Sequence, residues 1–137
     1  DLVRFVRCLT ALRGAHPALA AERFYTAAEI AWIGPEGGAP DWHGRDNRLG
    51  CIVEEGEGAR IALLFNAGLG PCRFALPPAP PGGWAAVVDT AAPPPGDAAD
   101  PGGPPLFRAE GPVELGPRSA LVLVCPTDAP APRRTPT

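Results

Sequence analysis

Acidic side chains are the first residues of this sequence whose spacing suggests chemistry. They fall into three groups: Glu54, Glu55 and Glu57; Asp41 and Asp46; and Asp97 and Asp100. Two carboxyl groups can hydrolyse a glycosidic bond when an apolar environment raises the pKa of one of them. None of these acids lies in apolar sequence, and their spacing differs from that of a calcium loop. We therefore predict solvated acids and no catalytic pair.

Nucleophiles and metal ligands are equally sparse. The sequence has one serine, Ser119, and two histidines, His16 and His43, without a turn typical of a catalytic nucleophile. The cysteines carry no CxxC motif and no histidine at ligand spacing. They are Cys8, Cys51, Cys72 and Cys125. We predict no catalytic residue, no metal and no cofactor, and we expect buried, reduced thiols, as in a cytoplasmic protein.

The three tryptophans offer a different chemistry, because a flat indole face can stack on a sugar ring. Trp32 and Trp84 lie in strand-like patterns, so we predict that both are core residues. Trp42 lies in a loop between Asp41 and His43, whose polar side chains can hydrogen-bond sugar hydroxyls. These three loop residues are the candidate binding site. We expect Trp42 to pack against a neighbouring domain, whereas exposure beside other aromatic residues favours sugar binding.

A helix is predicted over residues 1–21. Its apolar stripe follows the 3.6-residue period. The stripe consists of Leu2, Phe5, Val6, Leu9 and Leu12. Gly14 and Pro17 predict a break near its end. Because an exposed stripe favours association, we expect the helix to pack on its own sandwich or on a second copy of the chain.

Short apolar runs separated by Pro and Gly turns follow the helix. The expected strands are residues 29–33, 49–54, 60–66, 72–76, 84–89, 113–115 and 119–125. Because no strand–helix–strand alternation is visible, the pattern predicts a mainly β protein, a Greek-key-like antiparallel β-sandwich preceded by one α-helix. Residues 91–105 and 127–137 have too few apolar side chains to fold by themselves, and we expect both to be mobile.

The composition indicates which classes of binding partner to expect. The formal net charge is -3, which favours neither nucleic acid nor an anionic membrane, and no apolar run is long enough to span a bilayer. All 12 basic residues are Arg and alanine is abundant, which is typical of a GC-rich bacterial genome. The sequence begins within an amphipathic pattern, so we expect a fragment of a longer protein.

Several stretches resemble one family when taken in order. The segment 5–19 (FVRCLTALRGAHPAL) resembles the helix that closes the catalytic barrel in the α-amylase superfamily. Residues 30–35 (IAWIGP), 40–42 (PDW) and 47–49 (NRL) look like a stretch of isoamylases and glycogen-debranching enzymes, with Ile33 in place of the family's histidine. The segments 84–90 (WAAVVDT) and 115–119 (LGPRS) are similar to later parts of the same C-terminal domain.

This resemblance implies a parent α-1,6-glucosidase that acts on branched α-glucan in glycogen or starch metabolism. It also implies a retaining mechanism whose Asp nucleophile and Glu acid lie in the upstream barrel, so no residue here inherits them. Residues 1–22 then form the last helix of a missing (β/α)8 barrel, residues 23–126 form a β-sandwich that caps it, and residues 127–137 form a disordered tail. The alternatives are a carbohydrate-binding module centred on Trp42 and an immunoglobulin-like interaction domain.

If Trp42 binds glucan, the affinity of this site for the glucan chain is limited by the cost of immobilising the chain. A lone aromatic platform scarcely offsets the cost of immobilising a flexible chain. We therefore predict that maltooligosaccharides bind no more tightly than about millimolar.

Overall fold

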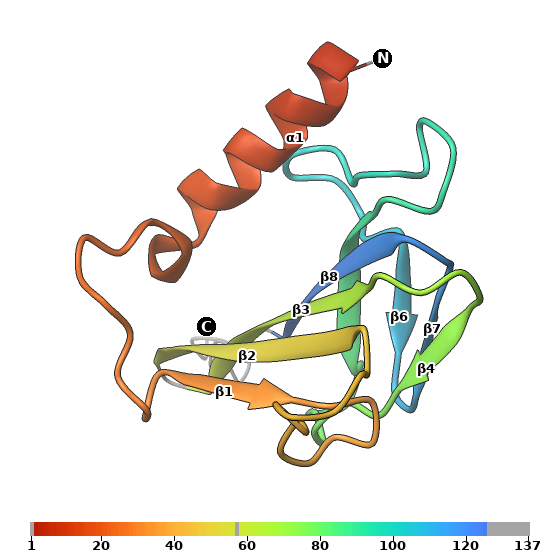
Figure 1. Cartoon of the computed structure of the whole chain (residues 1–137). Helices are drawn as coiled ribbons and strands as arrows, with labels where there is room; N and C mark the ends of the chain where they lie inside the picture. Colours follow the sequence, from red (N-terminus) through yellow and green to blue (C-terminus); the bar gives the residue numbers. More distant parts are fainter. Residues whose placement is uncertain (1, 57, 126–137) are drawn as a thin grey trace.

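A computed structural model describes residues 2–56 and 58–125 of the chain. It begins with the helix α1 (Leu2–Ala15) and a short 3-10 helix, η1 (Pro17–Ala20), so the predicted break falls between the two. A linker then leads into the strands, which lie to one side of α1 (Figure 1). The tail predicted at residues 127–137 lies outside the described residues.

Eight strands follow within the described ranges. They are β1 (Ile30–Ile33), β2 (Arg48–Gly56), β3 (Ala59–Asn66), β4 (Cys72–Phe74), β5 (Trp84–Asp89), β6 (Phe107–Ala109), β7 (Val113–Leu115) and β8 (Ser119–Cys125). Six of them form one sheet in the order β1-β2-β3-β8-β5-β6, and β4 pairs with β7 in a second sheet. Every strand pairing is antiparallel, which confirms the predicted mainly β, sandwich-like fold with one N-terminal α-helix.

The strand β8 lies at the centre of the larger sheet, between β3 and β5. Its residues alternate between buried and half-buried, because successive side chains of a strand point to opposite faces. Leu121 and Leu123 point into the main core, where Phe74 of β4 and Trp84 of β5 are also buried. The two-stranded sheet thus covers the inner face of the six-stranded sheet.

The outer face of the six-stranded sheet is apolar as well. Cys51, Val53 and Ile61 form a second buried cluster there, and Ala18 and Leu19 of η1 pack against it. Figure 1 shows the helical segment crossing above this side of the sheet. The N-terminal helices therefore cover part of an apolar face that would otherwise meet water.

The turn between β2 and β3 contains the glycines that the sequence placed there. Gly56 and Gly58 have φ angles of 87° and 84°, a left-handed conformation that side chains rarely adopt. The pairing register shifts between Glu54 and Gly56, so the strand carries an irregularity just before the turn. Glu57 lies outside the described residues.

The structure adds to the expectations at two places and contradicts one of them, at Trp32. Trp84 is a core residue as predicted, but Trp32 is 44% exposed, because it lies on the face of β1 opposite to buried Ile33. The strand β6 was not predicted, since its three residues follow a Pro- and Gly-rich segment and acquire strand geometry by pairing with β5. Residues 91–105 have little regular structure, yet they are held at their centre, where Ala98 is buried and bridges to Val88.

The side chains on the two faces of β8 differ in burial. Shortening a side chain on one face should therefore lower the free energy of unfolding more than shortening one on the other face. We expect Leu123→Ala to lower the free energy of unfolding by about 2–5 kcal/mol, because Leu123 is fully buried in the main core. The neighbouring Val122→Ala, on the half-buried outer face, should cost clearly less. Urea denaturation of both variants measures the difference, and equal losses would contradict this assignment of the core.

Candidate functional site

Two of the acidic residues named from the sequence are held by arginine side chains. Asp46 is bound by Arg48, with the Nε–Oδ1 distance at 2.8 Å, and these hydrogen bonds lower the pKa of the Asp46 carboxyl. Asp97 is bound by Arg4 at 3.0 Å. A neighbouring guanidinium stabilises the ionised form of a carboxylate, whereas a general acid must hold its proton.

Two of these acids are less solvated than predicted. Asp97 is 9% exposed, and the side chain of Glu55 is 11% exposed. Each is enclosed because it meets a side chain of the N-terminal segment, Arg4 in one case and His16 in the other. The prediction of uniformly solvated acids was therefore wrong at these two positions.

The serine and cysteine side chains are buried. The Ser119 hydroxyl donates a hydrogen bond to the Gly116 carbonyl at 2.7 Å and is buried at the start of β8. All four cysteines are buried, and no disulfide joins them within the described ranges. Burial raises the pKa of the Cys51 and Cys72 thiols, which disfavours the reactive thiolate.

Clusters of metal ligands and membrane-spanning helices were sought in the part of the chain that the structure describes. No group of three or more His, Cys, Asp or Glu side chains is arranged to hold a metal ion. No helix among these residues is long and apolar enough to cross a membrane.

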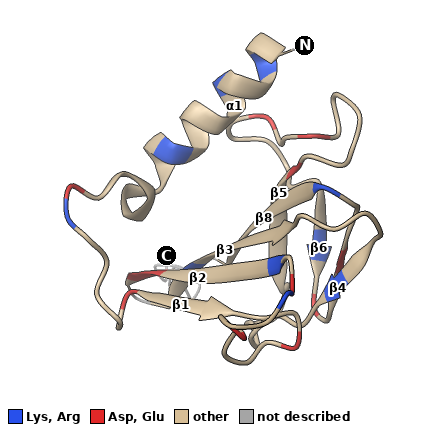
Figure 2. Ribbon diagram, viewed as in Figure 1, with Lys and Arg blue, Asp and Glu red and all other residues tan. Residues whose placement is uncertain are grey.

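The first candidate site is the junction between α1 and the segment that follows β5, where Arg4 makes four contacts. Its guanidinium donates to Asp97 Oδ1 at 3.0 Å, to the Ala98 carbonyl at 2.7 Å and to the Pro95 carbonyl at 3.1 Å. Asp100 lies 3.4 Å away. Figure 2 shows acidic residues in the loop beside α1 and basic residues along the helix. Arg4 thus fixes the helix to residues 95–100.

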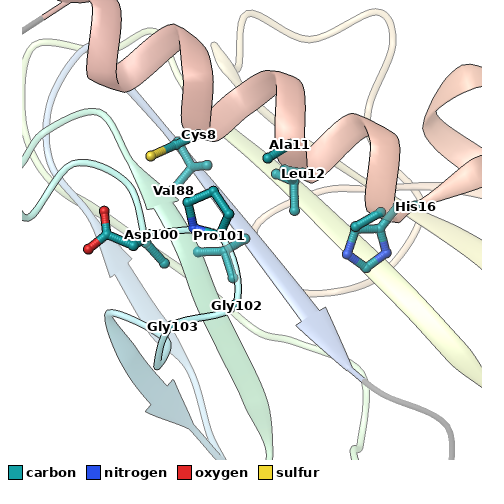
Figure 3. A pocket seen from close by; sticks show the side chains of 12 residues that line it. Cys8, Ala11, Leu12, His16, Val88, Asp100, Pro101, Gly102 and Gly103 are labelled. Carbon is teal, nitrogen blue, oxygen red and sulfur yellow. The ribbon is translucent and has the colours of Figure 1, made fainter.

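A small pocket lies beside this junction (Figure 3). It has a volume of about 210 Å³ and lies between Cys8 and Leu12 of α1, Val88 of β5 and residues 99–103. Its walls are mostly apolar or glycine, and the carboxylate of Asp100 is already near Arg4. The pocket marks incomplete packing between helix and sheet, because Pro101, Gly102 and Gly103 carry little bulk.

The other end of the helical segment is held by a polar contact. His16 Nδ1 lies 2.5 Å from Glu55 Oε1 at the end of β2, and both side chains are mostly enclosed. His16 thus has a side-chain partner that is distant along the chain. Arg4 therefore binds α1 to the β domain near the start of the helix, and His16 binds the chain to the β domain just after the helix ends.

The linker between η1 and β1 is held by side-chain contacts just before β1 begins. Arg23 binds Glu29 at 2.6 Å, and Glu29 also accepts hydrogen bonds from Thr26. The Arg23 guanidinium, followed by Thr26, lowers the pKa of the Glu29 carboxyl to about 2. The Glu29 carbonyl in turn accepts a bond from the Glu54 amide at 2.7 Å, which places the start of β1 against β2.

The second candidate site is the pair formed by Trp32 of β1 and Trp42 of the loop after it, which we call the tryptophan corner. The ring centroids are 5.9 Å apart and the ring planes meet at 72°. Trp42 is 63% exposed, beside the exposed residues Asp41 and His43. The structure therefore keeps the three predicted binding residues together in one turn and adds Trp32.

Trp32 and Arg4 are the site residues that the sequence analysis missed. A signal existed for Trp32, because in IAWI the alternation of side chains places Trp32 and Ile33 on opposite faces of the strand. Arg4 lies on the polar side of the predicted helix, and nothing in the sequence indicates that Asp97, distant along the chain, lies opposite it.

Comparisons with known proteins agree on one family. Residues 31–105 match the family model described as "Isoamylase 1-3, C-terminal". The rice (Oryza sativa subsp. japonica) protein "Isoamylase 1, chloroplastic" is 32% identical over 97 residues, which are 71% of this chain and 12% of the rice protein. The "Isoamylase" of Pseudomonas amyloderamosa is 32% identical over 95 residues, 63% of this chain and 12% of that protein. The match thus spans about 12% of the length of these curated relatives.

The Arg4 contacts make a testable prediction about the segment after β5. In Arg4→Ala, Asp97 and two carbonyl groups lose their donor, so the segment should loosen and the melting temperature should fall. Thermolysin followed by mass spectrometry should then cut first within residues 91–105. Arg7→Ala, which removes an exposed arginine of the same helix, is the matched control. Cleavage at the same rate in the native chain and in Arg4→Ala would show that Arg4 does not hold this segment.

Proposed function

Because this chain belongs to the family of isoamylase C-terminal domains, we propose that it is the non-catalytic C-terminal β-sandwich of a debranching enzyme. The parent enzyme is then an α-1,6-glucosidase that removes branches from glycogen or starch. The catalytic Asp and Glu lie in a barrel upstream of the domain. The sandwich covers one side of that barrel, and its role is structural.

The two sides of α1 support this proposal. One side packs on the β domain through buried Cys8 and through Arg4. On the other side, Leu2 is 76% exposed and Val6 is 51% exposed. The members of the predicted stripe therefore differ in exposure. Leu2 and Val6 are exposed, whereas Phe5, Leu9 and Leu12 are half-buried. A helix that is apolar on two sides suits a position between two bodies.

We propose that residues 1–22 are the last helix of the catalytic barrel and that the barrel covers Leu2 and Val6. The small share of the curated relatives' length that the chain spans accords with such a partner. Where the barrel is absent, the same side chains are the surface through which we expect copies of this chain to associate, together with Phe5 and Leu9.

We further propose a cytoplasmic location in a bacterium. Four buried cysteines without a disulfide suit a reducing compartment. The arginine-only, alanine-rich composition suits a GC-rich genome. The names of the rice and maize relatives state that those proteins are chloroplastic.

The DNA upstream of the codon for Asp1 tests the proposal directly. We expect an open reading frame that continues upstream and encodes eight strand–helix units, with an Asp and a Glu at the carboxyl ends of barrel strands. A stop codon in frame just before Asp1, or an unrelated upstream domain, would overturn the assignment to a debranching enzyme.

The isolated chain should have no glycosidase activity, because the described acids provide no carboxylate pair suited to this reaction. Release of reducing ends from pullulan and glycogen should equal that of buffer, with an isoamylase as the positive control. Turnover that persists with this chain through a second, different purification column would contradict the non-catalytic role.

A further inference from the structure

We propose that the tryptophan corner, Trp32 with Trp42, is an accessory binding site for an α-linked glucan chain. The sugar class rests on the proposed function, while the site itself rests on geometry. The site would hold a segment of glucan on the surface of the domain and perform no chemistry. Its ligand would be a linear run of α-1,4-linked glucose units.

The corner is a defined structure built on two neighbouring elements. Trp32 is held in β1, where it pairs with Cys51 of β2. Trp42 is held by a tight turn in which the Gly44 amide donates to the Asp41 carbonyl at 3.2 Å and the His43 amide donates to Asp41 Oδ1 at 3.1 Å. A Cβ atom at Gly44 would lie 2.6 Å from Asp41 Oδ2, so a larger residue there would displace the Asp41 side chain.

The arrangement of the rings suits a curved sugar chain. The two indole planes meet at 72°, so they present apolar faces in two directions at one place. An α-linked glucan is curved, and its successive rings therefore present their C–H faces at an angle to each other. Asp41 and His43 border the corner, and their polar atoms can exchange hydrogen bonds with the hydroxyl groups at the rim of each sugar ring.

Two stacking surfaces change the expected affinity. The expectation of no more than millimolar binding assumed a single aromatic platform at Trp42. The structure adds Trp32 at 5.9 Å, so the second contact is made by a chain that the first has already immobilised. We therefore expect a Kd on the order of 0.1–1 mM for maltoheptaose.

The corner and the exposed side chains that we assign to the barrel lie on different elements. Trp32, Cys51, Leu63, Val122 and Val88 form one row across β1, β2, β3, β8 and β5. Val88 lies beneath α1, where it lines the pocket at the helix junction. Four strand spacings of about 4.8 Å put Trp32 roughly 19 Å from Val88 along this row. Leu2 and Val6, which we assign to the barrel, lie in the N-terminal half of α1, whereas η1 packs against Cys51 of β2, the strand next to β1.

The experiment titrates maltoheptaose into the full chain while tryptophan fluorescence is recorded. Cellohexaose, a β-linked chain of similar chemistry, is the control ligand. The variants are Trp42→Ala and Trp32→Ala, with Trp42→Phe to keep an aromatic face. Phe107→Ala is the matched control, because Phe107 is 40% exposed on β6 at the other edge of the sheet. Isothermal titration calorimetry repeats the measurement, since removing a tryptophan also removes fluorescence.

We expect saturable binding of maltoheptaose, little binding of cellohexaose, and a Kd at least about tenfold higher in both alanine variants. Trp42→Phe should retain part of the affinity and Phe107→Ala all of it. Thermal melting of each variant shows whether it is folded. The proposal would be overturned if the native chain showed no saturable binding, or if Trp42→Ala and Trp32→Ala bound maltoheptaose as tightly as the native chain.

The outcome is independent of the test of the debranching assignment. An upstream barrel without glucan binding at the corner leaves the capping role in place and removes only the accessory site. Glucan binding without an upstream barrel instead supports a carbohydrate-binding module. Equal loss of binding in a folded Phe107→Ala variant would show that the effect is not specific to the corner and would also overturn the site.

Discussion

The structure depends on one constraint, which is that the central strand β8 is apolar on both faces. Leu121 and Leu123 point to the inner face, and Val122 and Val124 point to the outer face. A sheet built around such a strand must be covered on both sides, because each exposed apolar face costs free energy in water. The strands β4 and β7 cover the inner face. Among the described residues, the N-terminal helical segment covers part of the outer face.

The N-terminal helical segment buries little apolar surface on this outer face, and polar contacts hold the segment in place. The helix side that meets the sheet presents small residues such as Cys8 and Ala11, and it lies over Pro101 and Gly102. Such residues bury little apolar area, which is why a pocket remains there. Arg4 and His16 then supply directional contacts, to Asp97 with its neighbours and to Glu55. A helix held mainly by such contacts, with Leu2 and Val6 exposed, suits the proposed position between this domain and a larger one.

The edge of the sheet formed by β1 carries an exposed pair of aromatic side chains. The strand β1 is an edge strand of four residues, and a long loop returns from it to β2. The tight turn at Asp41 in that loop brings Trp42 against Trp32, so two large aromatic side chains stay exposed together. Exposed tryptophan is costly for a surface that has only to be solvated. The proposed glucan contact gives that surface a function apart from covering the barrel.

The sequence by itself determined the local features. Alternation and turn residues predicted most strands, Gly14 and Pro17 predicted the break after α1, and the apolar context of the cysteines predicted their burial. It also placed Asp41, Trp42 and His43 together. Tertiary structure alone decided the rest. Periodicity tells which side chains share a face, but not which face becomes covered, so Trp84 is buried and Trp32 is not. The enclosure of Asp97 and the pairing of β6 depend on segments distant along the chain, Arg4 and β5, whose approach no local pattern encodes.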